Sequence, residues 1–363
     1  MHVAMIMDEE RLLHEQLMLN RLVIGLIDHG AQVTRIIPDA MGSETIDAGE
    51  QRIALTPRLQ VPMRVLPWMR RTRAERIVEA AERTQYDLVY AVGEQAWPIG
   101  LDVSRQIEKP LALNVWSSAL VRRVPRARPQ GRIGCYITPT PTLARKLGKR
   151  VERDLVSMVP MGVSVPAESR TVLEDRDAVI GLAVIGSGRD AAAYEALLAG
   201  ISRVVREWPQ VQVVLELRGP RAHEIWRHAR RLDLLGAISG INDAAHHRSL
   251  LTRCDALLIP ESSGEMNSLI LDAMAMGLPV IATEDPDLDM LCPEAGTRLV
   301  SEPDPDAWYR HISALIKNPD EARSYGQKGR DIVARRYRSI DQIERLMQTF
   351  EMTLSGGSYR IHA

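Results

Sequence analysis

Near the middle of the chain, a fixed positive charge and two carboxylates occur in segments whose pattern suits an anionic ligand. Arg189 follows the glycine-bearing run 186–188, and Glu265 and Asp272 lie in or beside a polar loop further on. Arginine is permanently charged and donates hydrogen bonds, whereas carboxylates accept them. These residue types therefore suit a polar or charged ligand.

The run 255–283 predicts a strand, a loop, a helix and a second strand. Residues 256–259 are apolar, residues 262–267 are small or polar, and residues 268–276 have the apolar spacing of a helix. A polar loop that enters a helix directs several unpaired N–H groups and the positive end of the helix dipole at one point. That point suits a phosphate. The backbone N–H groups expected there are those of Met266, Asn267 and Ser268.

Strand and helix patterns alternate from the first residues onward. Residues 3–7 predict a buried strand, residues 10–29 a helix and residues 33–37 a second strand. Such β-α-β order indicates an α/β fold with parallel, doubly wound sheets. A length of 363 residues indicates two domains.

The composition excludes several classes of protein. The formal net charge is −1, so no overall charge attracts nucleic acid. The three cysteines lack the paired spacing of a zinc site or a redox dithiol and fit a reducing compartment. Without a signal-peptide pattern at the N-terminus or an apolar run long enough to span a bilayer, the expected location is the cytoplasm, with a peripheral membrane position as the variant.

The run from Pro260 to Val280, PESSGEMNSLILDAMAMGLPV, resembles the donor-site signature of the retaining GT-B glycosyltransferases of family four. The resemblance extends from about Val3 to about Leu354. It implies two Rossmann-like domains that face each other across a cleft, with a nucleotide diphosphate-sugar in the second and a hydroxyl acceptor, such as a glycan or a lipid-linked compound, in the first. It further implies a first domain over 1–166, a hinge over 167–177, a second domain over 178–337 and a C-terminal helix over 338–356 that completes the first domain.

Carried over position by position, the resemblance assigns roles in the second domain. Asp272 stands where the family has a Glu that contacts ribose, and Gly264 stands where the family's first Glu touches the donor sugar, so that Glu265 comes one residue late. Gly188 and Arg189 match a loop that grips the diphosphate. The lysine that normally accompanies this arginine is missing, and Arg218 is the candidate substitute. No metal or cofactor is implied, and the pair Asp285 and Asp287 falls after the donor helix.

Two features of the first domain have alternative interpretations. Asn114 follows a strand at the edge where the family carries a His or Asp near the reacting sugar; it either binds a sugar hydroxyl or caps a turn. The arginine-rich helix over 70–81 is either a solvated face, which the pattern favours, or a surface that docks on acidic lipid headgroups or a phosphorylated acceptor. The segment 55–67 before it is expected to be an ordered loop rather than a membrane insert.

Two functions follow from these features. The first is a retaining, metal-independent transfer of a hexose-type sugar from a nucleotide diphosphate donor to a hydroxyl, with Arg189, Glu265 and Asn114 as the candidate catalytic residues. The second is a GT-B protein with a weakened site that acts as a partner or a sugar- or nucleotide-binding subunit. The missing lysine and the displaced glutamate favour the second function, whereas Arg189 and Asp272 at their expected positions favour the first.

Overall fold

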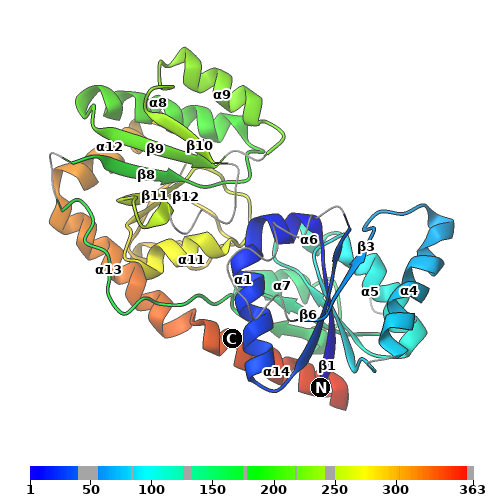
Figure 1. Ribbon diagram of the computed structural model, residues 1–363. Helices are drawn as coiled ribbons and strands as arrows, with labels where there is room; N and C mark the ends of the chain where they lie inside the picture. The colour runs from blue at the N-terminus through cyan, green and yellow to red at the C-terminus, as the bar shows by residue number, and fades with distance from the viewer. Residues whose placement is uncertain are drawn as a thin grey trace. The chain divides into compact units, whose positions relative to one another are not determined.

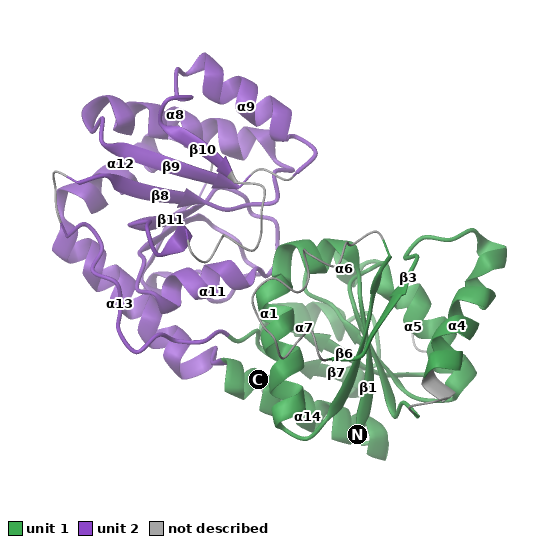
Figure 2. Ribbon diagram, in the orientation of Figure 1, with its two compact units in different colours: residues 1–162, 339–363 green, residues 163–338 purple. Residues whose placement is uncertain are grey.

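The computed structural model describes residues 1–39, 56–82, 85–125, 132–174, 178–216, 219–241, 250–301 and 303–357. The chain divides into two compact units (Figures 1 and 2). Unit 1 combines Met1–Gly162 with Ser339–Ala363, and unit 2 is Val163–Arg338. Each unit is an α/β body built on its own parallel sheet, so the alternating pattern of the sequence is confirmed.

Unit 1 contains a seven-stranded sheet within the described residues, in the order β3-β2-β1-β4-β5-β6-β7 and parallel throughout. The strands are β1 (His2–Met7), β2 (Gln32–Pro38), β3 (Arg58–Val61), β4 (Leu88–Val92), β5 (Leu111–Asn114), β6 (Ile133–Thr138) and β7 (Val156–Met158). The helices are α1 (Glu9–Asp28), α4 (Arg70–Glu82), α5 (Ala96–Ile107), α6 (Ser118–Val121), α7 (Pro141–Leu147) and α14 (Ser339–Ser355).

The end of the chain contributes directly to unit 1. Helix α14 packs against α1, and Phe350 of α14 makes an edge-on ring contact with Tyr90 of β4 at 5.3 Å between centroids. The hydroxyl groups of Ser157 and Thr349 are 2.9 Å apart and form a buried hydrogen bond between β7 and α14. The core of unit 1 is therefore closed by residues from both ends of the sequence.

Unit 2 contains a six-stranded parallel sheet in its described residues, in the order β10-β9-β8-β11-β12-β13. The strands are β8 (Ile180–Val184), β9 (Val211–Glu216), β10 (Ile238–Ile241), β11 (Ala256–Ile259), β12 (Val280–Thr283) and β13 (Thr297–Val300). The helices are α8 (Ala191–Glu207), α9 (Ala222–Arg231), α11 (Ser268–Ala275), α12 (Pro305–Lys317) and α13 (Pro319–Arg336).

Helix α11 is the most enclosed helix around the candidate site. All of its residues are buried, which agrees with its apolar composition. Beside it, three arginines fix the segment that enters unit 2. Arg323 of α13 donates to the carbonyl oxygens of Val172 and Leu173, and Arg170 donates to the Asp255 carboxylate at the start of β11, 3.2 Å away. Arg330 of α13 donates to the carbonyl oxygen of Pro166.

One expectation from the sequence changes in the structure. The segment 55–67 is not only a loop, because Arg58–Val61 forms the edge strand β3 beside β2. This strand escapes detection because it is short, polar and only partly buried. Arg218, the candidate substitute for the missing lysine, lies outside the described residues. Within the described residues, no helix is both long enough and apolar enough to cross a bilayer.

Candidate functional site

The candidate site of unit 2 lies where the strand order reverses. Strand β8 is followed in sequence by β9 on one side, whereas its neighbour β11 is followed by β12 on the other. The loops that leave β8 and β11 therefore diverge at the carboxyl edge of the sheet, and open α/β sheets bind their ligands at such a point. These loops are residues 185–190 and 260–267, which contain the glycine run and the polar loop identified in the sequence.

Glu261 joins these two loops and was not identified from the sequence. Its buried carboxylate accepts hydrogen bonds from the backbone N–H groups of Gly188, Arg189 and Asp190, at 3.1, 2.8 and 2.7 Å. These groups lie at the start of α8, where N–H donors and the helix dipole favour an anion. A carboxylate of the chain thus occupies the place where the resemblance implies a phosphate contact. The signal for it in the sequence is a glutamate two residues after the end of a buried strand.

Close backbone contact fixes the glycine loop from its other side. The backbone N–H of Arg221 donates to the carbonyl oxygen of Gly188 at 3.1 Å. Gly188 has φ +61°, and a Cβ atom at this residue would come within 3.0 Å of the Gly219 backbone. A Cβ on Gly219 would overlap the carbonyl oxygens of Ser187 and Gly188. Both positions therefore require glycine, one of them also for its conformation.

Arg189 and Glu265 are brought together by these loops. The Nη1 atom of Arg189 is 2.5 Å from Oε1 of Glu265, and the two side chains are 52% and 26% exposed. The pair joins the start of α8 to the loop that precedes α11. An anion that binds Arg189 must therefore compete with Glu265 or bind beside it.

Asp285 supports the loop that precedes α11. Its Oδ2 atom accepts a hydrogen bond from the Gly264 N–H at 2.7 Å, and its Oδ1 atom accepts from the Asp287 N–H at 2.9 Å. Gly264 has φ +64°, a conformation that few residues other than glycine adopt. Gly264 therefore turns the chain, which a Glu at this position would do at a conformational cost. In the part of the chain that the structure describes, no group of three or more His, Cys, Asp or Glu side chains is arranged to hold a metal ion.

The start of α11 is capped by Asn267, whose Oδ1 atom accepts from the Leu269 N–H at 2.9 Å. Met266 and Ser268 on either side are buried, so their contribution to a ligand would come from the backbone. Asp272 is fully buried within α11. The structure thus brings Arg189, Glu265 and the α11 N-terminus together, and it places Asp272 one helical turn further along α11.

Asn114 belongs to unit 1, at the end of β5. Its Nδ2 atom donates to the hydroxyl oxygen of Tyr90 at 3.3 Å, and its backbone carbonyl oxygen accepts from Trp97 Nε1 at 3.2 Å. Ser117 caps α6, and Lys146 Nζ donates to the Ser118 hydroxyl at 2.9 Å. Asn114 thus has a structural partner at the carboxyl edge of the sheet of unit 1.

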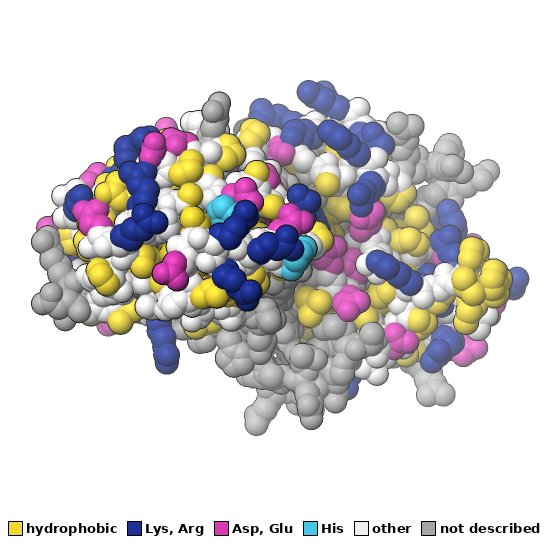
Figure 3. Space-filling view, turned by 90° about the horizontal axis from the view of Figure 1, so that it is seen from above, with side chains coloured by type: hydrophobic (Ala, Val, Ile, Leu, Met, Phe, Trp, Pro, Cys, Tyr) yellow, Lys and Arg dark blue, Asp and Glu magenta, His cyan; other side chains and the backbone are white. Residues whose placement is uncertain are grey.

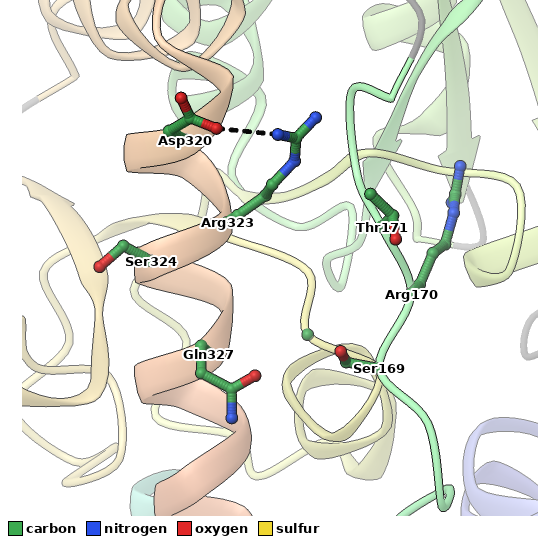
Figure 4. A pocket seen from close by; sticks show the side chains of 8 residues that line it. Ser169, Arg170, Thr171, Asp320, Arg323, Ser324 and Gln327 are labelled. Atoms are coloured by element: carbon green, nitrogen blue, oxygen red, sulfur yellow. Dashed lines mark hydrogen bonds and ion pairs between the residues drawn. The ribbon is translucent and has the colours of Figure 1, made fainter.

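A cavity of about 360 Å³ in unit 2 lies at the other end of α11 (Figure 4). It is bounded by the segment 169–171, by Gly277 after the helix, and by α13 with Asp320 and Arg323. Arg323 pairs with Asp320 at 2.9 Å and otherwise holds the chain at Val172 and Leu173. Because Gly277 precedes β12, this cavity lies toward the amino ends of the strands and is separate from the candidate site.

Residues 179–318 match the family model described as glycosyl transferases group 1. The matched stretch contains all the strands of unit 2 and therefore the whole candidate site. For this part of the chain, the match confirms the resemblance to group 1 glycosyltransferases. No curated protein matches the sequence.

Solved structures share the architecture of the whole chain. HepE from Anabaena, in complex with UDP and glucose, has a TM-score of 0.77 at 14% identity. The aligned region covers 96% of this chain and 99% of the HepE chain. Sucrose-phosphate synthase from Thermosynechococcus elongatus has a TM-score of 0.76 at 15% identity, with 98% of this chain and 100% of the synthase chain aligned. A Listeria monocytogenes protein assigned as a UDP-N-acetylglucosamine 2-epimerase has a TM-score of 0.66 at 13% identity, over 97% and 96%. These likenesses establish the expected GT-B fold.

Proposed function

From a GT-B fold whose second unit matches the glycosyl transferases group 1 model, we propose that the protein is a glycosyltransferase. It transfers a sugar from a nucleotide diphosphate-sugar to a hydroxyl acceptor. The observation that carries the proposal is that Arg189 and the N-terminus of α11 lie together at the strand-order switch point, inside the matched stretch. Among the proteins of the same fold, one is in complex with UDP and glucose and another is a sucrose-phosphate synthase, which supports a nucleotide-sugar donor.

In this proposal, Arg189 and the backbone at Asn267 and Ser268 bind the diphosphate. The transition state of sugar transfer places growing negative charge on the leaving diphosphate, and a fixed cation with oriented N–H groups stabilises that charge. The reaction is retaining, with attack on the face that the leaving group departs from, and it requires no metal. Gly264 would lie beside the donor sugar, and the acceptor would bind in unit 1 near Asn114. A ribose contact by Asp272 would require α11 to open, because this side chain is fully buried.

Two carboxylates set the properties of this site. Glu261 occupies the N–H groups of the glycine loop and positions Arg189 through the backbone, so the diphosphate is assigned to the α11 end of the site. Glu265 holds the Arg189 guanidinium at 2.5 Å, and an arriving diphosphate displaces it. Because Glu265 is partly exposed, its release costs less than the release of the buried Glu261.

The second candidate is a GT-B protein with a weakened site. It is favoured by Glu261 and Glu265, since these carboxylates engage both the Arg189 guanidinium and the glycine-loop amides. It would bind a nucleotide or sugar, or act as a partner subunit, without turnover.

Calorimetric titration with UDP, GDP and ADP tests the proposal, followed by a hydrolysis assay with the corresponding nucleotide-sugars. Arg189→Ala should weaken nucleotide diphosphate binding at least about tenfold, because it removes a charge-assisted contact. Glu265→Gln should tighten binding severalfold, because the guanidinium no longer has a competing carboxylate. Arg203→Ala is the matched control: this arginine of α8 is also ion-paired, with Asp306, but lies away from the loops of the site.

Binding of none of the nucleotides would exclude the donor site. Binding that Arg189→Ala leaves unchanged would show that the phosphate position is wrong. Binding without hydrolysis, in the presence of candidate hydroxyl acceptors, would favour the weakened site.

A further inference from the structure

The cavity at the end of α11, away from the candidate site, has a lining that suits a ligand. We name it the α11-end cavity. Its volume is about 360 Å³, and small-molecule sites in proteins have about 300–1,000 Å³. None of the described side chains that line it is hydrophobic. The hydrogen-bonding groups are the hydroxyls of Ser169, Thr171 and Ser324, the amide of Gln327 and the ion pair of Asp320 with Arg323.

The two walls of the α11-end cavity are both fixed to the end of α11. On one side, the segment 169–171 is attached by the Arg170 N–H, which donates to the carbonyl oxygen of Met276 at 2.9 Å. On the other side, α13 approaches so closely that a Cβ atom on Gly326 would lie 1.9 Å from the carbonyl oxygen of Gly277. The separation of the walls is therefore set by the fold, and a ligand would bind without a rearrangement of the backbone.

The polar groups of α13 retain hydrogen-bonding capacity. Asp320 accepts from Arg323 Nη1 at 2.9 Å through one oxygen, and its side chain is 98% exposed, so this pair is weak. The Nε2 atom of Gln327 donates to Asp331 Oδ1 at 2.7 Å, which fixes the amide and leaves its oxygen as an acceptor. In Figure 4 this oxygen is turned toward Ser169 on the opposite wall.

The charges along the lining cancel. Arg323 is paired with Asp320, and Arg170 is paired with Asp255 at 3.2 Å. A phosphate or carboxylate at Arg323 would lie beside the Asp320 carboxylate, and this repulsion disfavours an anionic ligand. The absence of hydrophobic side chains among the described lining residues disfavours an aromatic or acyl ligand. A neutral ligand with many hydroxyl groups fits both conditions.

Positive charge gathers on another part of unit 2. Arg227, Arg230 and Arg231 of α9 are exposed, and Figure 3 shows Lys and Arg side chains gathered on the face seen from above. A strongly negative ligand would be attracted to such a surface rather than to a lining of balanced charge.

We propose that the α11-end cavity binds a neutral saccharide, apart from the site of sugar transfer. Each sugar hydroxyl donates and accepts, and the lining offers hydroxyl, amide, guanidinium and carboxylate groups for both. The bound sugar connects the segment 169–171 to α13 and so stabilises unit 2. This inference goes beyond the proposed sugar transfer and does not depend on it, because no residue of the candidate site lines the cavity.

The test is saturation-transfer NMR on the full chain without any nucleotide. The probes are glucose, galactose, mannose and N-acetylglucosamine, with glucose 1-phosphate as the charged counterpart. At least one neutral sugar should bind with millimolar affinity, and glucose 1-phosphate should bind no more tightly than glucose. Asp320→Ala with Gln327→Ala should weaken sugar binding at least about fivefold, because two acceptors are removed. Both residues are exposed, so urea unfolding should show that the double variant is folded.

Lys328→Ala is the matched control, because Lys328 is also exposed on α13 but does not line the cavity. This variant should bind sugar as the unmodified protein does. Arg189→Ala should also retain the sugar signal, which separates the α11-end cavity from the donor site.

The proposal is overturned if none of the neutral sugars binds the unmodified protein, or if the Asp320 and Gln327 double variant binds them equally well. Loss of the signal in Arg189→Ala would place the sugar at the site of transfer instead. Tighter binding of glucose 1-phosphate than of glucose, lost in the double variant, would show an anion site and contradict the argument from charge.

Discussion

Single buried carboxylates fix several loops of this protein by accepting hydrogen bonds from backbone N–H groups. Glu261 fixes the glycine loop of unit 2 with three hydrogen bonds, and Asp255 accepts from the N–H groups of Leu173 and Gly181 at 3.0 and 2.9 Å. Such groups are costly to bury unless they are fully hydrogen-bonded, and here backbone donors supply the bonds. Their position after or before a strand was visible in the sequence, but their partners were not.

Asp8 of unit 1 should produce a measurable pH dependence of stability. It is buried at the N-cap of α1, where burial raises the pKa of its carboxyl to about 6 although the N–H groups of Arg11 and Gln95 lower it. Because the carboxyl has a higher pKa in the folded chain than in the unfolded chain, its contribution to folding stability is fully present below the unfolded pKa. That contribution is lost as the pH rises to and through 6. We expect this loss to be about 2 kcal/mol between pH 4 and 7, and Asp8→Asn to remove it.

The measurement is urea unfolding of the unmodified protein and of Asp8→Asn at each pH, with Asp154→Asn as the control. Asp154 is exposed in the same unit and takes no part in the Asp8 contacts, so Asp154→Asn should keep the pH dependence of the unmodified protein. Parallel curves for Asp8→Asn and the unmodified protein would show that Asp8 is not the source of the pH dependence.

At the scale of elements, the order of the strands creates the candidate site. The loops after β8 and β11 meet because these strands are neighbours in space although about 70 residues separate them in sequence. The turn before α9 also approaches, through the contact of Gly219 with the loop after β8. The geometry of the site therefore depends on how closely the backbone at Gly219 approaches the loop after β8.

Gly219→Ala should disrupt this arrangement. The new methyl group overlaps the carbonyl oxygens of Ser187 and Gly188, and these backbone atoms cannot move away without moving the loop that carries Arg189. We expect a destabilisation of roughly 2–4 kcal/mol in chemical denaturation, together with weaker nucleotide diphosphate binding.

Gly236→Ala is the control for Gly219→Ala. A Cβ atom at Gly236 has no neighbour within 4 Å, so the substitution should change stability by less than about 0.5 kcal/mol. Equal effects of the two substitutions would contradict the close approach of the loops after β8 and before α9.

At the scale of the whole molecule, the chain returns to unit 1 to complete its core. Helix α14 packs against α1, and Gly25 lies directly beneath Ile343. A methyl group on Gly25 would overlap the Ile343 side chain. The two residues are more than 300 positions apart in the sequence. Their contact can therefore be used to test whether α14 packs against α1.

A double-mutant cycle tests this contact. Gly25→Ala and Ile343→Ala should each destabilise unit 1, the first by overpacking and the second by leaving a cavity. The double variant should be more stable than the sum of the two effects predicts, by about 1–2 kcal/mol, because the smaller side chain makes room for the new methyl group. The readouts are denaturant unfolding and proteolysis between α13 and α14. Strict additivity would show that α14 does not pack on Gly25.

The sequence by itself determined the class of fold, because apolar periodicity and helix boundaries are local properties of the chain. It also located the glycine loop around Arg189 and the entry to α11, since glycine, polar residues and helix starts are recognisable without tertiary contacts. It missed β3, which is a short edge strand with a mixed pattern, and the seat of α14 on Gly25 was beyond any local pattern.

Only the tertiary structure decided what the charged residues of the site do. It pairs Glu265 with Arg189, gives Glu261 the N–H groups of the glycine loop and gives Asp285 the Gly264 N–H. These partners come from loops that are separated in sequence and brought together by the strand order. The strength of hydrogen bonds and ion pairs changes when the distance between donor and acceptor changes by a few tenths of an ångström. The spacing of residues along a chain does not specify distances to that precision. The pattern therefore specified where an anion site could form, and the folded chain specified which carboxylates already engage its donors.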